Sequence, residues 1–323
     1  MWDRETLKQK RIGVLLGGMS SEREVSLMSG KAILQALLDL GYEGRPIEAD
    51  ENLALSLRQE GIEVAFIGLH GALGEDGSVQ GLLEMMRIPY TGSGILASAL
   101  AMNKLVSRQI FTQSSLPVPR FLFLSRPPEG GVNRSLIPFA PPVVIKPCQE
   151  GSSVGVTIAS DDLDISRGAE KAFAYGGGIL IEEYIRGREI QLGILDDVAL
   201  GAIEIVPKEG FYDYEAKYTD GLADHFFPAP IPREDYEQAL DLGLKAHRLM
   251  GCEGATRVDF LYQEPGKFFL LEVNTLPGMT PLSLLPEIAK GVGIPFPDLV
   301  ERILLGARLR IQAQPKEDST TIG

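Results

Sequence analysis

Residues 268–280, with the sequence FFLLEVNTLPGMT, constrain this chain more than any other stretch. Four apolar residues in a row predict a buried strand. Glu272 and Asn274 near its end share a face, because side chains alternate along a strand. The earlier segment ATRVDF predicts a second strand, on which Arg257 and Asp259 share a face. The turn-forming segment QEPGK lies between the two, so we expect a hairpin that brings Asp259, Glu272 and Asn274 together.

These three side chains predict a metal site. They offer hard oxygen ligands with no His or Cys among them, and such a set suits Mg²⁺, which usually keeps waters and shares its shell with substrate phosphates. The alternative is a solvated hairpin edge with ordinary polar residues. The apolar run FFLL fits that alternative less well, because a solvated edge does not normally follow so apolar a segment.

The composition excludes some partners and locations. The chain has 323 residues, enough for two or three domains, and 31 basic against 44 acidic residues give a formal charge of -13. This balance disfavours nucleic acid, whereas a small phosphorylated ligand needs only a few basic residues. Two cysteines favour a reducing compartment. Neither an apolar targeting segment nor a membrane-spanning run is found, so we expect a cytoplasmic protein without a membrane partner.

The N-terminal region predicts an open α/β unit. Residues 11–18, RIGVLLGG, predict a strand that enters a glycine turn, and Ser21 with Glu24 three residues later predicts a capping box for the next helix. Glu22 lies at this strand-turn-helix joint, where helix amides are available to a ligand. Interaction with the helix dipole is its alternative role. The dinucleotide fingerprint GxGxxG is absent, so nothing supports NAD.

A second unit of the same kind follows. Residues 64–69 predict a strand that closes on HGALGEDG, and a helix is expected over about 79–86. His70 in this glycine-flanked loop is a candidate site residue, with loop hydrogen bonding as the alternative. After IPYTGSG, a helical run is expected from Ile95 to Lys104, and residues 105–113 continue it until SSLP breaks it.

The middle of the chain carries a glycine-rich loop beside a lysine. VVIK at residues 143–146 predicts a strand, PCQEGSSVG a loop, and residues 156–158 another strand. Such a loop can fold over phosphates while Lys146 supplies charge, although an ordinary hairpin loop is equally compatible with the pattern. Further on, Glu182 and Glu189 could bind adenine and ribose or could be solvated charges. A long polar and aromatic segment with Lys217 and Tyr218 then predicts a functional lid, and the polar tail from 312 closes the chain.

Seven motifs in one order connect these observations. GGMSSEREVS, LHGALGEDG, YTGSG, IKPCQEGSSVG, YDYEAKY, RVDF and LEVNTLPGMT occur over residues 17–280, and together they closely resemble the D-alanine:D-alanine ligase family of the ATP-grasp superfamily. The resemblance implies a mixed α/β and α+β architecture, the ATP-grasp fold with a Rossmann-like pre-ATP-grasp domain. Its implied parts are residues 1–104 (pre-ATP-grasp), 105–186 (central, with the glycine-rich loop), 187–312 (C-terminal, with metal site and lid) and the tail 313–323.

The resemblance also implies ligands and the residues that hold them. The ligands are ATP, two Mg²⁺ ions with Mn²⁺ as a substitute, and two D-alanine molecules. Asp259, Glu272 and Asn274 would bind the ions, with Glu272 bridging them. The implied nucleotide contacts are Lys104, Lys146, Glu150, Ser153, Glu182, Glu189 and Lys217. The implied D-alanine contacts are Glu22, His70, Arg257, Gly278 and Ser283.

The implied reaction has two steps. The γ-phosphoryl group of ATP is transferred to the first D-alanine, and the amine of the second then attacks the acyl phosphate to give D-alanyl-D-alanine for peptidoglycan. A hydrogen-bond chain of Glu22, Ser152 and Tyr218 would help to deprotonate that amine. Arg257 and the amide of Gly278 would stabilise the oxyanion. Relatives that make the D-lactate ester commonly have Phe at the lid position, so Tyr218 favours the dipeptide.

Two departures and two alternatives accompany this interpretation. Asn103 stands where the family pattern has Asp, and Cys148-Gln149 occupy loop positions often filled by small or basic residues. One alternative is a D-alanine:D-lactate or other carboxylate-amine ligase. The other is a nucleotide-binding protein that has lost its chemistry, against which the full set of charged residues argues. The resemblance further implies a homodimer.

Overall fold

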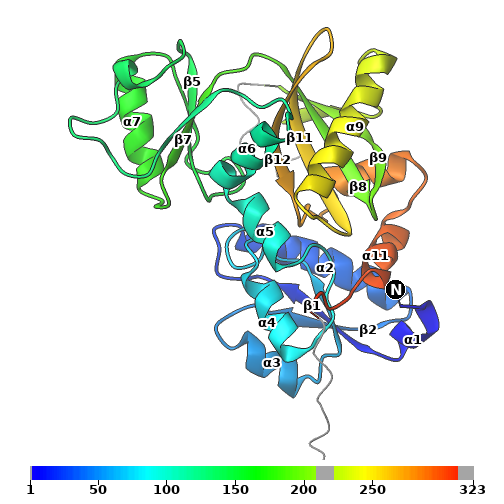
Figure 1. Ribbon diagram of the computed structural model, residues 1–323. Coiled ribbons are helices and arrows are strands. Elements are labelled where there is room, and N and C mark those ends of the chain that lie inside the picture. The colour runs from blue at the N-terminus through cyan, green and yellow to red at the C-terminus, as the bar shows by residue number, and fades with distance from the viewer. Residues whose placement is uncertain (1, 209–221, 312–323) are drawn as a thin grey trace, which may run out of the picture.

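The computed structural model describes residues 2–208 and 222–311, and within these ranges the strands form three sheets (Figure 1). The N-terminal sheet is parallel, in the order β2-β1-β3. Its elements are α1 (Arg4–Lys8), β1 (Arg11–Leu16), α2 (Arg23–Asp39), β2 (Glu43–Glu48), α3 (Leu53–Gln59), β3 (Val64–Ile67) and α4 (Ser78–Met86).

Helices cover both faces of this sheet because its strands are apolar on both sides. On one face, Ile12 and Val14 pack with α2 and with α11 (Phe296–Leu305), which returns from the far end of the chain. On the other face, Leu15 and Ile67 pack with α3 and α4. The predicted open α/β unit is therefore confirmed, and its glycine-rich loops lie at the carboxyl ends of the strands.

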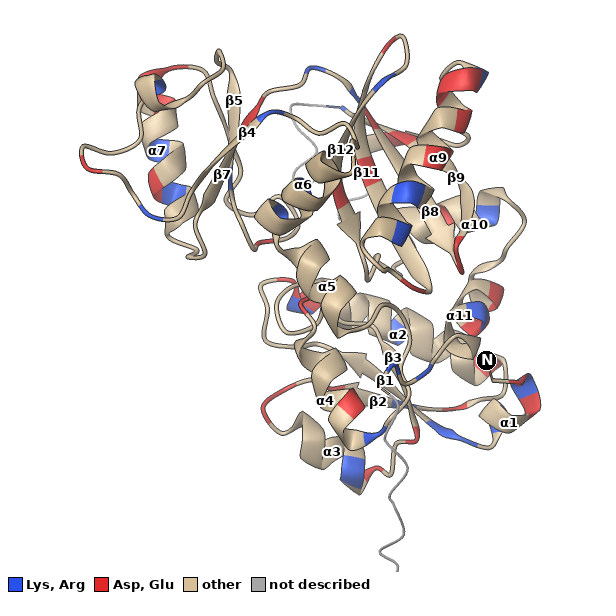
Figure 2. Ribbon diagram, in the orientation of Figure 1, with Lys and Arg blue, Asp and Glu red and all other residues tan. Residues whose placement is uncertain are grey.

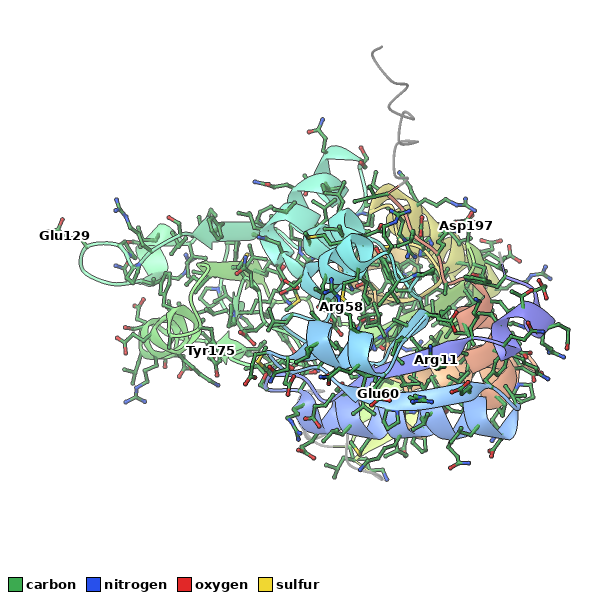
Figure 3. The ribbon with its side chains drawn as sticks, turned by 90° about the horizontal axis from the view of Figure 1, so that it is seen from below. Arg11, Arg58, Glu60, Glu129, Tyr175 and Asp197 are labelled. Carbon is green, nitrogen blue, oxygen red and sulfur yellow. The ribbon has the colours of Figure 1, made fainter. Side chains whose placement is uncertain are left out.

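The central sheet is antiparallel, in the order β4-β7-β5-β6, with α7 packed on one face. The strands predicted around Lys146 and at 156–158 are both present, and the glycine-rich loop joins them. Figure 3 shows Glu129 and Tyr175 together on this lobe, which extends from the rest of the molecule. Its elements are β4 (Phe121–Leu124), η1 (Arg134–Leu136), β5 (Val143–Pro147), β6 (Thr157–Ala159), α7 (Asp162–Phe173) and β7 (Ile179–Glu183).

The C-terminal sheet is antiparallel, in the order β10-β9-β8-β11-β12, and it contains the predicted hairpin. Asp259 on β11 is paired with Glu272 on β12, and Arg257 with Asn274. Acidic residues begin the long helix α9 and basic ones end it, which suits the helix dipole (Figure 2). The elements are β8 (Arg188–Leu195), β9 (Val198–Pro207), β10 (Ala223–Phe226), α9 (Arg233–Leu249), β11 (Ala255–Gln263), β12 (Lys267–Asn274) and α10 (Leu284–Gly291).

The helix expected to run continuously from 95 to 113 is instead two helices, α5 (Ile95–Met102) and α6 (Lys104–Gln113). Asn103 separates them with extended backbone, and its side-chain oxygen accepts a hydrogen bond from the Val106 N–H at 3.1 Å. The prediction of one helix was wrong because apolar periodicity continues through a residue that caps the second helix. Asn103 supplies the same acceptor as the expected Asp, so this departure from the family pattern keeps the cap.

Two helices pack outside the parts to which the predicted boundaries assign them. Phe111 of α6 belongs to the core of the C-terminal sheet, together with Ile190. Helix α11 packs on the N-terminal sheet, as described above. The three sheets separate the chain into parts more clearly than the predicted domain boundaries do. Those boundaries remain a prediction. No helix in the described ranges has the length and apolar character needed to cross a bilayer.

Candidate active site

Two cavities meet beneath the glycine-rich loop. The larger, of about 400 Å³, lies between the central and C-terminal sheets and is lined by Lys146, Glu182 and Asp259, among others. The smaller, of about 80 Å³, is lined by Glu22 and His70 from the N-terminal part and by residues of the C-terminal hairpin. Both are lined by Lys104, Glu150, Gly151, Ser152, Gln191 and Glu272. The larger has the size of a cofactor site and the smaller adjoins it, so a chemical group could pass from a ligand in one cavity to a ligand in the other.

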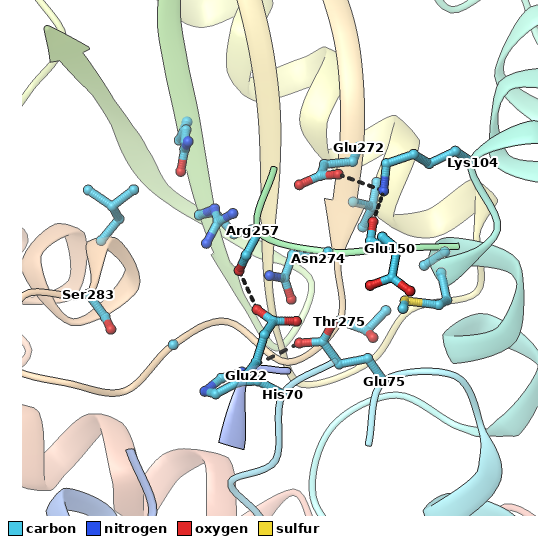
Figure 4. Close-up of a pocket in the computed structure, with 18 of the residues that line it drawn as sticks. Glu22, His70, Glu75, Lys104, Glu150, Arg257, Glu272, Asn274, Thr275 and Ser283 are labelled. Atoms are coloured by element: carbon cyan, nitrogen blue, oxygen red, sulfur yellow. Dashed lines mark hydrogen bonds and ion pairs between the residues drawn. The ribbon is translucent and has the colours of Figure 1, made fainter. Parts of the chain in front are cut away.

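The predicted metal ligands share one face of the hairpin. Asp259 and Glu272 are directly paired, so their side chains lie side by side, and Asn274 follows two residues later. Arg257 donates to both Asp259 oxygens at 2.8 Å each. Lys104 Nζ lies 3.7 Å from a carboxylate oxygen of Glu272 (Figure 4). Among the described residues no group of three or more His, Cys, Asp or Glu gathers to hold a metal ion, either here or elsewhere, so this hairpin offers only two carboxylates and one amide. Two carboxylates and an amide are oxygen donors of the kind that could hold Mg²⁺ when phosphates and water complete its shell.

A buried ion-pair triad forms the wall of the larger cavity. Glu182 accepts from Arg108 Nε at 2.7 Å and pairs with Lys146 Nζ at 2.6 Å. Burial opposes the charged form of Glu182, but the two cations outweigh it and lower its pKa. Burial lowers the pKa of Lys146 to about 8, against the attraction of Glu182. Both Glu182 oxygens are thus held by cations, and a contact with adenine would come in addition to these ion pairs.

Arg108 is a site residue that the sequence reasoning missed. Its side chain is fully buried, and it also donates to the Leu271 carbonyl on β12. Within the helical run 105–113 it has the appearance of an ordinary surface arginine. The buried residues of α6 are Ser107, Arg108 and Phe111, so the local pattern does not mark this arginine as buried.

The predicted capping box at Ser21 and Glu24 is wrong. Helix α2 begins at Arg23, and Glu22 at its N-cap makes no side-chain capping bond. Its carboxylate instead accepts a hydrogen bond from the Ser152 hydroxyl in the glycine-rich loop. Local capping loses to this contact because the loop covers the start of α2. Two members of the predicted chain of Glu22, Ser152 and Tyr218 therefore touch, whereas Lys217 and Tyr218 lie outside the described residues.

His70 is fixed on both ring nitrogens. Ser29 Oγ lies 3.0 Å from Nε2, and Glu75 Oε1 lies 3.4 Å from Nδ1. Burial raises the pKa of Glu75, and the nearby carboxylates of Glu22 and Glu272 raise it further while His70 opposes them. Glu75 was not singled out from the sequence, although it lies in the same glycine-rich segment as His70. Its position in the same loop as His70 could have identified Glu75 as a candidate site residue.

The remaining predicted residues also reach the cavities. Gly278 and Ser283 line the smaller cavity with Arg257, and a Cβ at Gly278 would lie 2.6 Å from Ser283 Oγ, so the backbone there has no room for a side chain. Ser283 Oγ accepts from the Thr280 N–H at 2.9 Å, which fixes its position. Ser153 and Glu189 line the larger cavity, as does Glu150, whose carbonyl accepts from Lys104 Nζ at 2.6 Å.

The second departure from the family pattern, Cys148-Gln149, does not remove the backbone contact that holds the glycine-rich loop. The Cys148 carbonyl accepts from the Lys104 N–H at 2.9 Å, a bond that does not depend on the side chain. The thiol is buried, which raises its pKa, and it donates to the Asn103 side-chain oxygen at 3.4 Å. Cys148 is thus packed as a small buried residue, and its backbone connects the loop to the start of α6.

Comparisons with known proteins agree with this geometry. The family described as D-ala D-ala ligase C-terminus matches residues 110–305, and D-ala D-ala ligase N-terminus matches residues 50–93. A D-alanine–D-alanine ligase of Trichlorobacter lovleyi is 54% identical over 308 residues, 95% of this chain and 98% of the relative. One of Geobacter sulfurreducens is 55% identical over 312 residues, 96% of this chain and 98% of the relative.

Solved structures agree with the sequence relatives. The crystal structure of D-alanine–D-alanine ligase from Bacillus anthracis has a TM-score of 0.82 and 36% identity, and the match covers 92% of this chain and 97% of that one. The same enzyme complexed with ATP has a TM-score of 0.80 and 36% identity, with 92% and 96% covered. The predicted ATP-grasp fold is therefore confirmed, and this chain belongs to the D-alanine–D-alanine ligase family.

Proposed function

We propose that this protein is an ATP-dependent ligase that joins two D-alanine molecules into D-alanyl-D-alanine, releasing ADP and phosphate, for peptidoglycan precursor synthesis. The observation that carries the proposal is the junction of the two cavities, where Lys104, Ser152 and Glu272 line both. A carboxylate is a poor acylating agent, so its activation needs a phosphoryl donor beside it. The junction provides that adjacency for a nucleotide in one cavity and an amino acid in the other.

The larger cavity would hold ATP, as the ATP complex of the Bacillus anthracis relative supports. Lys104 and Lys146 would attract the phosphates, Glu150 and Ser153 would lie in the loop over them, and Glu189 would reach the ribose. Asp259, Glu272 and Asn274 would hold two Mg²⁺ ions, which neutralise charge on the transferred phosphoryl group. Lys217 would contribute to phosphate binding as well.

The smaller cavity would hold the two D-alanine molecules. Glu22 would pair with the ammonium of the first, and His70 would lie near its carboxylate. Ser283 would meet the carboxylate of the second. Ser152, already bonded to Glu22, would work with Tyr218 to remove the proton from the attacking amine.

We further propose a cytoplasmic homodimer whose subunits divide into the domains 1–104, 105–186 and 187–312. Each domain is built on one of the three sheets. Apolar clusters pack on each of the three sheets, which supports this division, although α6 and α11 pack across it.

The activity is tested by following ADP release with different acceptors. We expect D-alanine to stimulate ADP release strongly, L-alanine not at all, and D-lactate with D-alanine to yield little ester at neutral pH. ADP release with D-lactate equal to that with D-alanine would favour an ester-forming ligase. ATP binding without D-alanine-dependent ADP release would favour a nucleotide-binding protein that has lost its chemistry, and would refute the proposal.

Nucleotide binding should weaken in alkaline solution because of Lys146. Only its protonated form attracts phosphate, and burial lowers its pKa to about 8. Since the proton is lost as pH rises through this value, the Kd for ADP should increase up to about tenfold per pH unit above it. A Lys146→Arg variant stays charged and should show a flat profile between about pH 7 and about pH 10. Equal profiles for both proteins, measured by calorimetry, would exclude Lys146 as the titrating group.

A further inference from the structure

Gln191 on β8 is a buried polar residue that the proposed function leaves unused. Its side chain is 3% exposed and lines both cavities at their junction. Its neighbours Ile190 and Leu192 point the other way, into the core of the C-terminal sheet. The side-chain carbonyl oxygen of Gln191 finds no hydrogen-bond donor among the residues that the structure describes. A buried acceptor without a donor is rare in folded proteins, and one that faces a cavity can be satisfied by a ligand that donates.

The strand register places Gln191 in line with two of the proposed metal ligands, Asp259 and Glu272. Gln191 is paired with Asp259, which is paired in turn with Glu272, so the three side chains lie in line on one face of β8, β11 and β12. On its other side Gln191 is paired with Ile203. A carboxylate on one side and an alkyl group on the other cannot donate a hydrogen bond. Arg257, two residues before Asp259 on β11, donates from Nε and Nη2 to the Asp259 carboxylate.

No donor for the Gln191 oxygen lies among the described residues, which points to a donor on a ligand. Phosphate and carboxylate oxygens accept hydrogen bonds, so neither ATP phosphates nor a D-alanine carboxylate can satisfy Gln191. Water bound to a divalent cation is a strong donor, and Mg²⁺ usually keeps several waters. We propose that Gln191 is a positioning residue for the divalent cation beside Asp259, its side-chain carbonyl accepting a hydrogen bond from a cation-bound water. This inference rests on the proposed function, since it requires the metal–nucleotide complex.

Direct metal titration tests the proposal without turnover. Free Mn²⁺ is followed by electron paramagnetic resonance in the presence of saturating ADP and without D-alanine. Gln191→Leu removes the acceptor at similar volume and should raise the Kd for Mn²⁺ about tenfold or more, the usual cost of losing an outer partner of a metal site. Gln191→Glu keeps an acceptor and adds charge, and should bind Mn²⁺ at least as tightly as wild type.

Gln80 provides a matched control. It is also a buried glutamine whose side-chain oxygen has no donor among the described residues, but it lines neither cavity and donates to the Gly74 carbonyl. Gln80→Leu should leave Mn²⁺ affinity unchanged. Thermal unfolding without ligand gives a second readout: Gln191→Leu should be no less stable than wild type, because an unsatisfied acceptor contributes nothing to the fold.

The outcomes separate this inference from the function itself. Wild-type protein that binds no Mn²⁺ with ADP would overturn the proposed function. Wild-type binding with unchanged affinity in Gln191→Leu, or weaker binding in Gln191→Glu, would overturn only the role of Gln191. An altered KM for D-alanine alone, with Mn²⁺ affinity intact, would assign the acceptor to a substrate amine and likewise refute the proposal.

Discussion

A Glu272→Gln variant is expected to lose about 10³-fold in kcat, because the substitution keeps the shape of the side chain and removes the charge that would hold the proposed cations. Glu272 is paired with Asp259, lines both cavities and lies 3.7 Å from Lys104. It would therefore contact the cations and also face the phosphoryl group that is transferred. Its side chain is one-third exposed, so the fold should tolerate the change. The measurement is kcat from ADP release at saturating Mg²⁺.

The control is the same substitution at the far end of the same hairpin. Glu264 lies at the turn between β11 and β12 and is exposed, and it lines neither cavity. Glu264→Gln should retain wild-type kcat and Mn²⁺ affinity, while Glu272→Gln should lose both. Near-normal turnover of Glu272→Gln in saturating Mg²⁺ would remove Glu272 from the metal site. Lost turnover with intact Mn²⁺ affinity would place its role in the phosphoryl transfer instead.

Local patterns were sufficient to predict much of the fold. The hairpin with Asp259 opposite Glu272 followed from strand alternation and a short turn, both of which depend only on neighbouring residues. The β-turn-α joints near Glu22 and His70 followed in the same way from glycine turns beside apolar runs. The roles of these residues came from the family resemblance, because spacing alone cannot distinguish a ligand from a solvated charge.

Contacts between distant residues were not predictable. Arg108 is buried because Glu182, 74 residues away, accepts its guanidinium. Glu22 stands at the N-cap of α2 without a side-chain capping bond, and Ser152, 130 residues away, donates to it instead. In both cases the local signal is that of an ordinary exposed helix, and the tertiary partner reverses it. Gln191 belongs to the same class, since its burial beside Asp259 depends on which strand pairs with β11.

An Arg257→Met variant is expected to lose about 10²-fold or more in kcat, equivalent to about 2.7 to 4 kcal/mol of barrier for one oxyanion donor. Arg257 lines the smaller cavity beside Gly278 and is mostly buried. A donor at that place would stabilise charge that develops only in the transition state, so kcat should fall more than KM changes. The measurement is steady-state kinetics with D-alanine as the varied substrate.

The difficulty is that Arg257 also holds Asp259 through two 2.8 Å bonds, so its loss could act through the metal. Arg257→Lys separates the two effects, because lysine keeps a positive charge near Asp259 but cannot form the paired bonds of a guanidinium. If Arg257 stabilises the oxyanion, the lysine variant should regain wild-type Mn²⁺ affinity while kcat stays low. If Arg257 serves only to hold Asp259, Mn²⁺ affinity and kcat should recover together, and the oxyanion role would be refuted.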